Sequence, residues 1–122
     1  MGQVKTFRDL VAWQRGMELA KRIYKSSQAM PKEEQFGLTN QLRRAAVSVP
    51  SNIAEGFGRE RRRDLLQILR IARGSLNELS TQYELAVELL MIEADQTMIE
   101  LINETDRVLQ GLISSLQRLE TQ

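Results

Sequence analysis

The sequence predicts an all-α protein, an antiparallel four-helix bundle with up-down-up-down topology, built as one domain from residues 1–122. Apolar residues recur at three- and four-residue steps in four segments, which is the period of a helix with one buried face. The three connections between these segments are short, and short connections favour antiparallel neighbours. Strand signals do not compete, because the chain has two prolines, few β-branched clusters and no hairpin dipeptide.

The first predicted helix runs from about Phe7 to Gln28. Thr6 and Asp9 have the spacing of a capping box, although Glu or Gln is usual at the second position. Pro31 ends the segment, because the residue before a proline is pushed out of the α region. The apolar residues that form the expected core face are Leu10, Trp13, Met17, Ala20 and Tyr24.

The second predicted helix runs from about Glu33 to Phe57 and contains a proline. Its apolar stripe continues through Pro50 without losing phase, which a loop or a sharp turn would not allow. We therefore expect a kinked but continuous helix, although an interior proline costs about 3 kcal/mol. The hydroxyl groups of Ser48 and Ser51 are expected to cap the freed backbone groups, and the Gly-Phe-Gly run at 56–58 to stop the helix. The stripe consists of Leu38, Leu42, Ala45, Ala46, Val49, Ile53, Ala54 and Phe57.

The third predicted helix runs from about Arg62 to Met91, and the fourth from its N-cap Asp95 to about Leu119. The core face of the third helix consists of Leu65, Leu69, Ala72, Leu76, Leu79, Tyr83, Ala86 and Leu90. The wide stripe of the fourth consists of Met98, Leu101, Ile102, Thr105, Val108, Leu109, Leu112, Ile113, Leu116 and Leu119. Further apolar surface beside these faces is predicted from Leu66, Ile68, Ile71, Val87, Trp13 and Phe57. A large apolar patch is unusual on a monomer, so a homo-oligomer is expected.

The composition excludes several kinds of chemistry. The chain has no cysteine, so it forms no disulfide and no thiolate zinc site. It has no histidine, which removes the commonest general base and the commonest metal ligand. Ser48 and Ser51 therefore lack a partner base for nucleophilic catalysis. We expect no enzyme activity, no cofactor and, without a long apolar run, no membrane contact; the expected location is the cytoplasm.

Charge is unevenly distributed along the chain. Residues 1–75 contain fifteen Lys or Arg against seven Asp or Glu, whereas residues 76–122 contain two against nine. Arginine suits phosphate through its planar fork, so the arginines of the basic half predict contact with an RNA or DNA backbone. The alternative is a solvated turn whose arginines pair with Glu55, Glu60, Asp64 or the acidic half, and the sequence leaves both open. The candidate residues are Arg43, Arg44, Arg59, Arg61, Arg62, Arg63, Arg70 and Arg73.

Two pairs of residues on the predicted helices require a separate interpretation. Asn52 and Glu55 are expected to form a buried polar network or to contact the backbone of a partner, in preference to a catalytic role. Gly74 and Ser75 lie in the middle of the third helix, where glycine costs about 1 kcal/mol relative to alanine. Close approach of a neighbouring helix, with Pro50 as the contact, is the expected reason.

Three runs of the sequence resemble one protein family: FRDLVAWQRGMELAKRIY, QFGLTNQLRRAAVSVPSNIAEGFGR and ILRIARGSLNELSTQYELAVEL. They are similar to the bacterial 23S ribosomal RNA intervening-sequence proteins, and the accessory variability protein of diversity-generating retroelements is a similar relative. The positions that match are Gln41, Arg43, Arg44, Ser48, Pro50, Asn52, Glu55, Gly56, Gly74, Ser75 and Glu78. The chain departs from the family at GRERRRD, where a serine N-cap is usual, so a ragged start to the third helix is expected.

The resemblance implies a four-helix bundle that assembles as a ring-like homopentamer and has no enzymatic activity. The retroelement relative is thought to bind nucleic acid and a reverse transcriptase through a basic surface. The sequence thus predicts an oligomeric protein that binds RNA or DNA through its arginines, with one basic and one acidic face on the ring. The alternative is a structural or adaptor oligomer that binds another protein.

Overall fold

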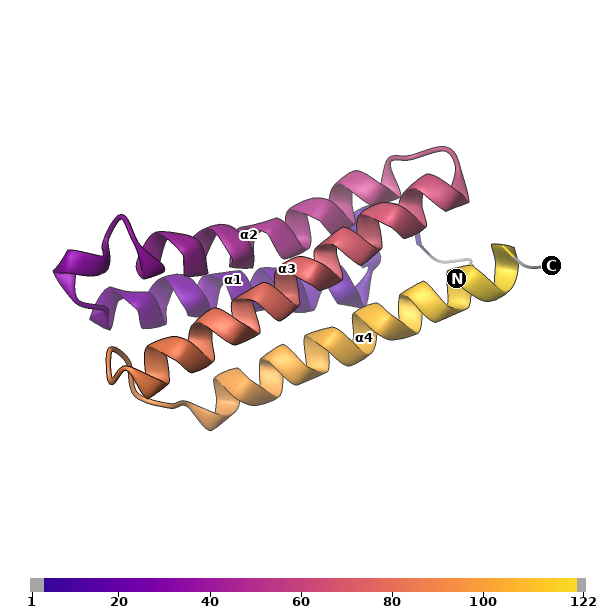
Figure 1. Cartoon of the computed structure of the whole chain (residues 1–122). Helices are drawn as coiled ribbons and strands as arrows, with labels where there is room; N and C mark the ends of the chain where they lie inside the picture. Colours follow the sequence, from indigo (N-terminus) through magenta and orange to yellow (C-terminus); the bar gives the residue numbers. More distant parts are fainter. Residues whose placement is uncertain (1–3, 121–122) are drawn as a thin grey trace.

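The computed structural model describes residues 4–120, which form four long helices and short 3₁₀ segments (Figure 1). In chain order the elements are η1 (Phe7–Asp9), α1 (Val11–Ser26), η2 (Ser27–Ala29), η3 (Lys32–Glu34), α2 (Leu38–Phe57), α3 (Arg62–Glu88) and α4 (Gln96–Glu120). None of these helices is long and apolar enough to cross a membrane. The predicted all-α class is confirmed.

The four helices lie along one long axis and alternate in direction (Figure 1). Each helix packs on the next one in the chain, and α4 packs back on α1. Backbone contacts join α1 to α2, α2 to α3, α3 to α4 and α4 back to α1. Within the described residues the diagonal pairs, α1 with α3 and α2 with α4, do not make such contacts. The α1–α2 and α3–α4 connections lie at one end of the bundle, and the α2–α3 turn at the other.

A single apolar core runs between the helices. Its fully buried large side chains come from all four of them: Leu19, Ile23, Leu42, Val49, Ile53, Leu69, Leu76, Leu79, Met98 and Leu109. Thr105 is buried among them, and its hydroxyl donates to the Leu101 carbonyl one turn earlier at 2.7 Å. The predicted core faces of α2 and α4 are therefore largely confirmed, although Leu119 is 46% exposed.

Leu10 is buried as predicted, but from there on the predicted face of α1 is wrong by one position. The residues of α1 that enter the core are Ala12, Gly16, Leu19 and Ile23. The predicted residues Trp13, Met17, Ala20 and Tyr24 lie beside this stripe, toward the outer edge of the contact with α2. The reason is that α1 packs closely on α2 through small side chains, and small side chains are weak apolar signals in a sequence.

The helix through Pro50 is continuous, as predicted, because α2 extends from Leu38 to Phe57 with the proline inside it. Its start is later than predicted. Residues 32–34 form a separate 3₁₀ turn, and the Glu34 carboxylate accepts from the Leu38 N–H at 3.0 Å, which satisfies one free donor at the start of α2. Phe36, between these elements, is 88% exposed.

At the ends of α3 and α4, one predicted helix cap is confirmed and two predictions of burial are wrong. Asp95 caps α4 through its carboxylate, which accepts from the Thr97 N–H at 3.0 Å. Leu66 is buried and Leu65 only half-buried, so these neighbours exchange their predicted roles. Leu90 was expected in the core but is 91% exposed, because α3 ends at Glu88 and the chain turns away there.

Candidate nucleic-acid interface

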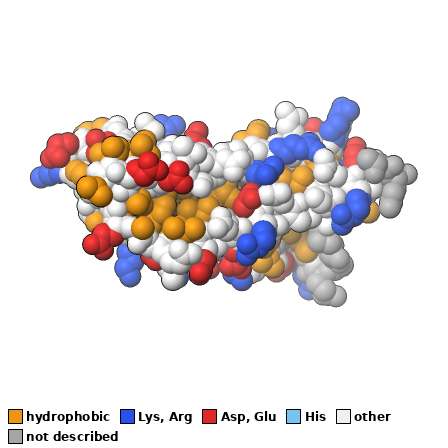
Figure 2. Space-filling view, turned by 60° about the horizontal axis from the view of Figure 1, so that its bottom comes forward, with side chains coloured by type: hydrophobic (Ala, Val, Ile, Leu, Met, Phe, Trp, Pro, Cys, Tyr) orange, Lys and Arg blue, Asp and Glu red, His pale blue; other side chains and the backbone are white. Residues whose placement is uncertain are grey.

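The turn between α2 and α3 concentrates arginine at one end of the bundle. Gly58 is the C-cap of α2, and Arg61 is the N-cap residue of α3, although its side chain makes no capping hydrogen bond. Figure 2 shows Lys and Arg side chains gathered toward the end of the molecule that holds this turn. The turn and the first residues of α3 present four exposed arginines: Arg59, Arg61, Arg62 and Arg63.

Most of these arginines have no ion-pair partner in the part of the chain that the structure describes. Arg59 forms an ion pair with Glu55 at 2.8 Å, and both side chains are about half exposed, so the pair contributes only about 0.3–0.5 kcal/mol. Arg61, Arg62 and Arg63 make no ion pair with any residue between positions 4 and 120. Pairing with local acids, the alternative left open by the sequence, therefore accounts for Arg59 alone at this turn.

A groove of about 490 Å³ extends the basic surface from the turn across to α4. Arg63 and Arg70, two turns apart on one face of α3, form one side, and the buried Leu66 lies between them. The other side comes from the last turns of α4: Ser114, Gln117, Arg118 and Glu120. The sequence analysis missed these α4 residues, because only the packing of α4 against α3 brings them to the arginines. The hydroxyl, amide and guanidinium groups suit a phosphate ligand, whereas the Glu120 carboxylate at the edge of the groove opposes one.

The remaining predicted arginines do not join this surface. Arg43 and Arg44 lie on α2 about 20 Å along the helix from its end, at a rise of 1.5 Å per residue. Arg43 donates to the Ser27 hydroxyl at 2.8 Å and covers the Tyr24 ring, so it supports the α1–α2 contact. Arg44 lines a small polar hollow with Glu78. Arg73 pairs with Asp106 of α4 at 3.4 Å.

The basic turn opposes the local electrostatics of α3. The first turn of a helix carries a partial positive charge, which favours acidic side chains and disfavours basic ones by typically 0.3–1 kcal/mol each. Here Arg62 and Arg63 begin α3, and Asp64 is the acidic residue of that turn. Helix stability thus does not explain the arginines at this position.

The charge asymmetry of the sequence becomes an asymmetry along the bundle axis. The half with the α2–α3 turn, residues 4–15, 51–74 and 107–120, contains eleven Lys or Arg and five Asp or Glu. The other half, residues 16–50 and 75–106, contains six and eleven. Ion pairs such as Arg15 with Glu104, at 2.7 Å, join the basic and acidic parts of the sequence near the middle. The Glu104 carboxylate, by its hydrogen bond, raises the pKa of Arg15.

The family motif around Pro50 forms a polar contact between α2 and α3. The Ser48 and Ser75 hydroxyl groups are 2.8 Å apart and share a hydrogen bond. The Asn52 amide donates to both the carbonyl and the hydroxyl oxygen of Ser48, each at 2.8 Å. The expected capping role of Ser48 is therefore wrong: its hydroxyl joins two helices. A polar network around Asn52 is present, but it is half-buried and its other members are Ser48 and Ser75. Glu55 is not part of it, since it is exposed and pairs with Arg59.

The close approach predicted for Gly74 occurs at another glycine. A Cβ atom on Gly74 would meet nothing within 4 Å, so this position is open. A Cβ atom on Gly16 of α1 would lie 3.3 Å from the Pro50 Cβ. Gly56 is buried beneath α3, where a Cβ atom would lie 3.0 Å from Leu65. Both contacts show that α2 is held tightly on two sides along its proline-containing half.

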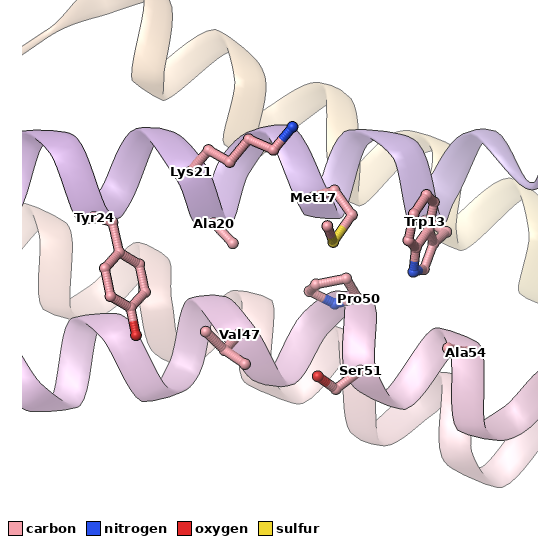
Figure 3. Close-up of a pocket in the computed structure, with 9 residues that line it drawn as sticks. All are labelled: Trp13, Met17, Ala20, Lys21, Tyr24, Val47, Pro50, Ser51 and Ala54. Atoms are coloured by element: carbon pink, nitrogen blue, oxygen red, sulfur yellow. The ribbon is translucent and has the colours of Figure 1, made fainter. Parts of the chain in front are cut away.

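An apolar groove of about 590 Å³ runs along the outer edge of the α1–α2 contact (Figure 3). Figure 3 shows Trp13, Met17 and Tyr24 of α1 facing Val47 and Pro50 of α2 across it. The groove holds the stripe that the sequence assigned to the core. It has no polar cluster suited to catalysis, and no group of three or more Asp or Glu within residues 4–120 is arranged to hold a metal ion.

Fold and site together define a helical-bundle protein with a basic end, without a recognisable catalytic or metal centre in its described part. The chain belongs to the 23S rRNA-intervening sequence protein family, whose model matches residues 8–114. A solved structure with the same fold is a protein with unknown function from the S23 ribosomal protein family of Bacteroides thetaiotaomicron. It has a TM-score of 0.72 and 24% sequence identity, and the match covers 87% of this chain and 98% of that one. No curated protein matches the chain.

Proposed function

We propose that the protein is a non-enzymatic binding protein whose basic end contacts the backbone of RNA or DNA. The observation that carries this proposal is the set of exposed arginines at the α2–α3 turn, Arg61, Arg62 and Arg63, which lack intramolecular ion pairs within residues 4–120. The adjoining groove supplies Arg70 and uncharged donors from α4. The name of the family agrees with a role near RNA genes.

The contact is made chiefly to phosphate. Aromatic side chains at this end are engaged in the protein itself: Phe57 packs against the core, and Phe7 packs edge-on against Trp13 and is covered by Arg8. Without free aromatic rings, bases do not stack on the protein, and base discrimination is small. Each phosphate contact releases a counterion, so log affinity falls with log salt by about 0.9 per contact on duplex DNA and about 0.7 on single strands.

The test is a salt titration of binding to labelled RNA and DNA. Replacement of Arg61, Arg62 and Arg63 with glutamine reduces affinity on all sequences and flattens the salt slope. The matched control replaces Lys21, Lys25 and Lys32 with glutamine, which makes the same charge change in the other half of the bundle. Equal losses in the two triple variants, or no binding by the unmodified protein at low salt, contradict the proposal.

Assembly into a homo-oligomer in the cytoplasm is part of the same proposal. Its support is the unpartnered apolar surface: the α1–α2 groove, together with Ile71 and Leu85, which are 52% and 47% exposed on α3. Of the surface predicted from the sequence, Leu66 is buried and no longer contributes. The number of five subunits rests on the family resemblance. Sedimentation equilibrium tests it, and a monomer at micromolar concentration contradicts it.

The second candidate function is an adaptor oligomer that binds another protein and no nucleic acid. The apolar groove of Figure 3 favours it, because such grooves receive helices of partner proteins. The salt titration separates the two functions, since an adaptor has no salt-dependent affinity for RNA or DNA.

A further inference from the structure

At the end of the bundle opposite the basic turn, an exposed leucine has a left-handed backbone conformation. Leu90 follows α3 with a φ of 60°, the only positive φ of a non-glycine residue between positions 4 and 120. Its N–H donates to the Val87 carbonyl at 3.0 Å, and the Met91 N–H donates to the Ala86 carbonyl at 2.9 Å. These two bonds define a Schellman motif, in which the left-handed position is usually glycine.

Leucine at this position has two costs that glycine would avoid. The left-handed conformation brings its Cβ close to the following carbonyl oxygen. Its side chain is also 91% exposed, so its apolar surface gains nothing from burial.

The leucine stands beside an apolar hollow of about 340 Å³. The lining residues come from η2, the last turn of α3 and the α3–α4 connection: Ala29, Val87, Leu90, Met91, Ile92, Glu93 and Ala94. Leu89, the preceding residue, is 53% exposed. The connection is fixed at its far end, because the Asp95 N–H donates to the buried Tyr83 hydroxyl at 2.9 Å. The exposed Leu90 side chain and the hollow beside it, on a connection that is held in place, form a preorganised contact surface.

The chain that carries this surface is acidic, although Arg22 of α1 reaches the start of α4, where it donates to the Thr97 hydroxyl at 2.9 Å. Residues 74–106 contain eight Asp or Glu and no Lys or Arg. Glu88 and Glu93, on either side of Leu90 in the chain, make no ion pair with any described residue. Nucleic acid and anionic lipid are repelled by such a rim, whereas a cationic protein segment is attracted.

We propose that the hollow beside Leu90 binds a basic, apolar segment of another protein, an amphipathic stretch that combines leucine-like side chains with lysine or arginine. An apolar side chain of the partner fills the hollow against Leu90, and its cations pair with Glu88 and Glu93. The protein then binds nucleic acid at one end and a protein at the other.

The test uses a labelled amphipathic peptide with leucine on one face and lysine on the other, added to the full-length protein. Two matched peptides replace the leucines with serine or the lysines with glutamate. We expect only the parent peptide to bind, with an affinity that falls as salt is added. The Leu90→Gly variant weakens binding by about tenfold or more, the loss typical of an anchor residue, while its thermal midpoint rises.

Two further variants assign the charges. Replacing Glu88 and Glu93 with glutamine weakens binding, whereas replacing Glu78 and Glu100 with glutamine, the same charge change elsewhere in the acidic segment, leaves it nearly unchanged. Unchanged affinity in Leu90→Gly, or equal losses in the two double variants, overturns the proposal. Self-association of the peptide-free protein that Leu90→Gly abolishes also overturns it, because the occupant is then a second copy.

Discussion

The two ends of α3 differ in charge and in the way they meet solvent. At its start, Arg62 and Arg63 lie at the positive end of the helix dipole, and at its last turns Glu84 and Glu88 lie at the negative end. Both arrangements oppose the dipole, which favours acids at the start and bases at the end. A helix selected only for stability would have the reverse order. This order agrees with the two proposals, in which the first end contacts phosphate and the second a cationic partner.

This comparison requires that α3 remain one rigid helix. Packing of its middle in the core keeps it rigid. Leu76 lies in the middle of α3 and is 1% exposed. Leu76→Ala removes buried methyl groups and leaves a cavity, so we expect a loss of about 2–5 kcal/mol in the free energy of unfolding. Urea denaturation measures it, with Leu89→Ala as a control at a half-exposed site. Similar small losses in both variants would contradict the assignment of Leu76 to the core.

The contact of α1 with the proline of α2 gives the next largest effect. Gly16→Val places a branched side chain where even a Cβ atom would lie 3.3 Å from Pro50, and overpacking of this kind costs about 1–3 kcal/mol. Gly74→Ala, at an open and exposed helix position, should instead stabilise by about 0.5–1 kcal/mol. Thermal denaturation of the two variants shows opposite shifts. A shift of the same sign in both would refute the placement of the close contact at Gly16.

The acidic end provides a smaller effect of opposite sign. Leu90→Gly relieves the left-handed conformation, so the free energy of unfolding should rise by about 1 kcal/mol. Leu89→Gly, one position earlier and with a negative φ of −84°, should lower it. Equilibrium unfolding of both variants measures these two changes in the free energy of unfolding. Stabilisation by neither substitution would mean that the leucine is not strained.

Acid should weaken the α4 end of this region slightly. The hydrogen bond from the Thr97 hydroxyl, above all, lowers the pKa of Asp95 below its ordinary value. A carboxyl group with a lowered folded pKa contributes stability that is complete above its unfolded pKa of about 3.9 and is lost as pH falls through the folded value. Thermal midpoints measured between neutral pH and strong acid should therefore fall less in Asp95→Asn than in the unmodified protein. Equal pH dependence would contradict this role for Asp95.

The sequence predicted the bundle well because long amphipathic helices with short connections leave little choice of topology. Periodicity also placed Pro50 inside a helix, since the apolar stripe kept its phase. It failed on α1, where the more apolar stripe with Trp13 and Tyr24 faces a groove and the core side includes Ala12 and Gly16. Periodicity finds an apolar face but does not tell a core from an unpartnered surface.

The candidate interface was predicted in part for a similar reason. Four arginines close in sequence at the α2–α3 turn stay together in space, whereas Arg43 and Arg44 separate from them because α2 is one long continuous helix. The α4 side of the groove, with Ser114 and Gln117, carries no motif in the sequence and depends on the pairing of helices distant in the chain. Leu90 was missed because helical periodicity continues past the actual end of α3.

The most direct test of the comparison is a map of backbone amide chemical shifts during addition of a single-stranded oligonucleotide at low salt. We predict that shifts concentrate at residues 57–70 and 110–118, around the basic turn and its groove, and disappear as salt is added. Residues 29–36 and 85–95, at the acidic end, should not respond. Shifts of equal size at both ends, or shifts confined to the acidic end, would contradict the account of two ends with different ligands.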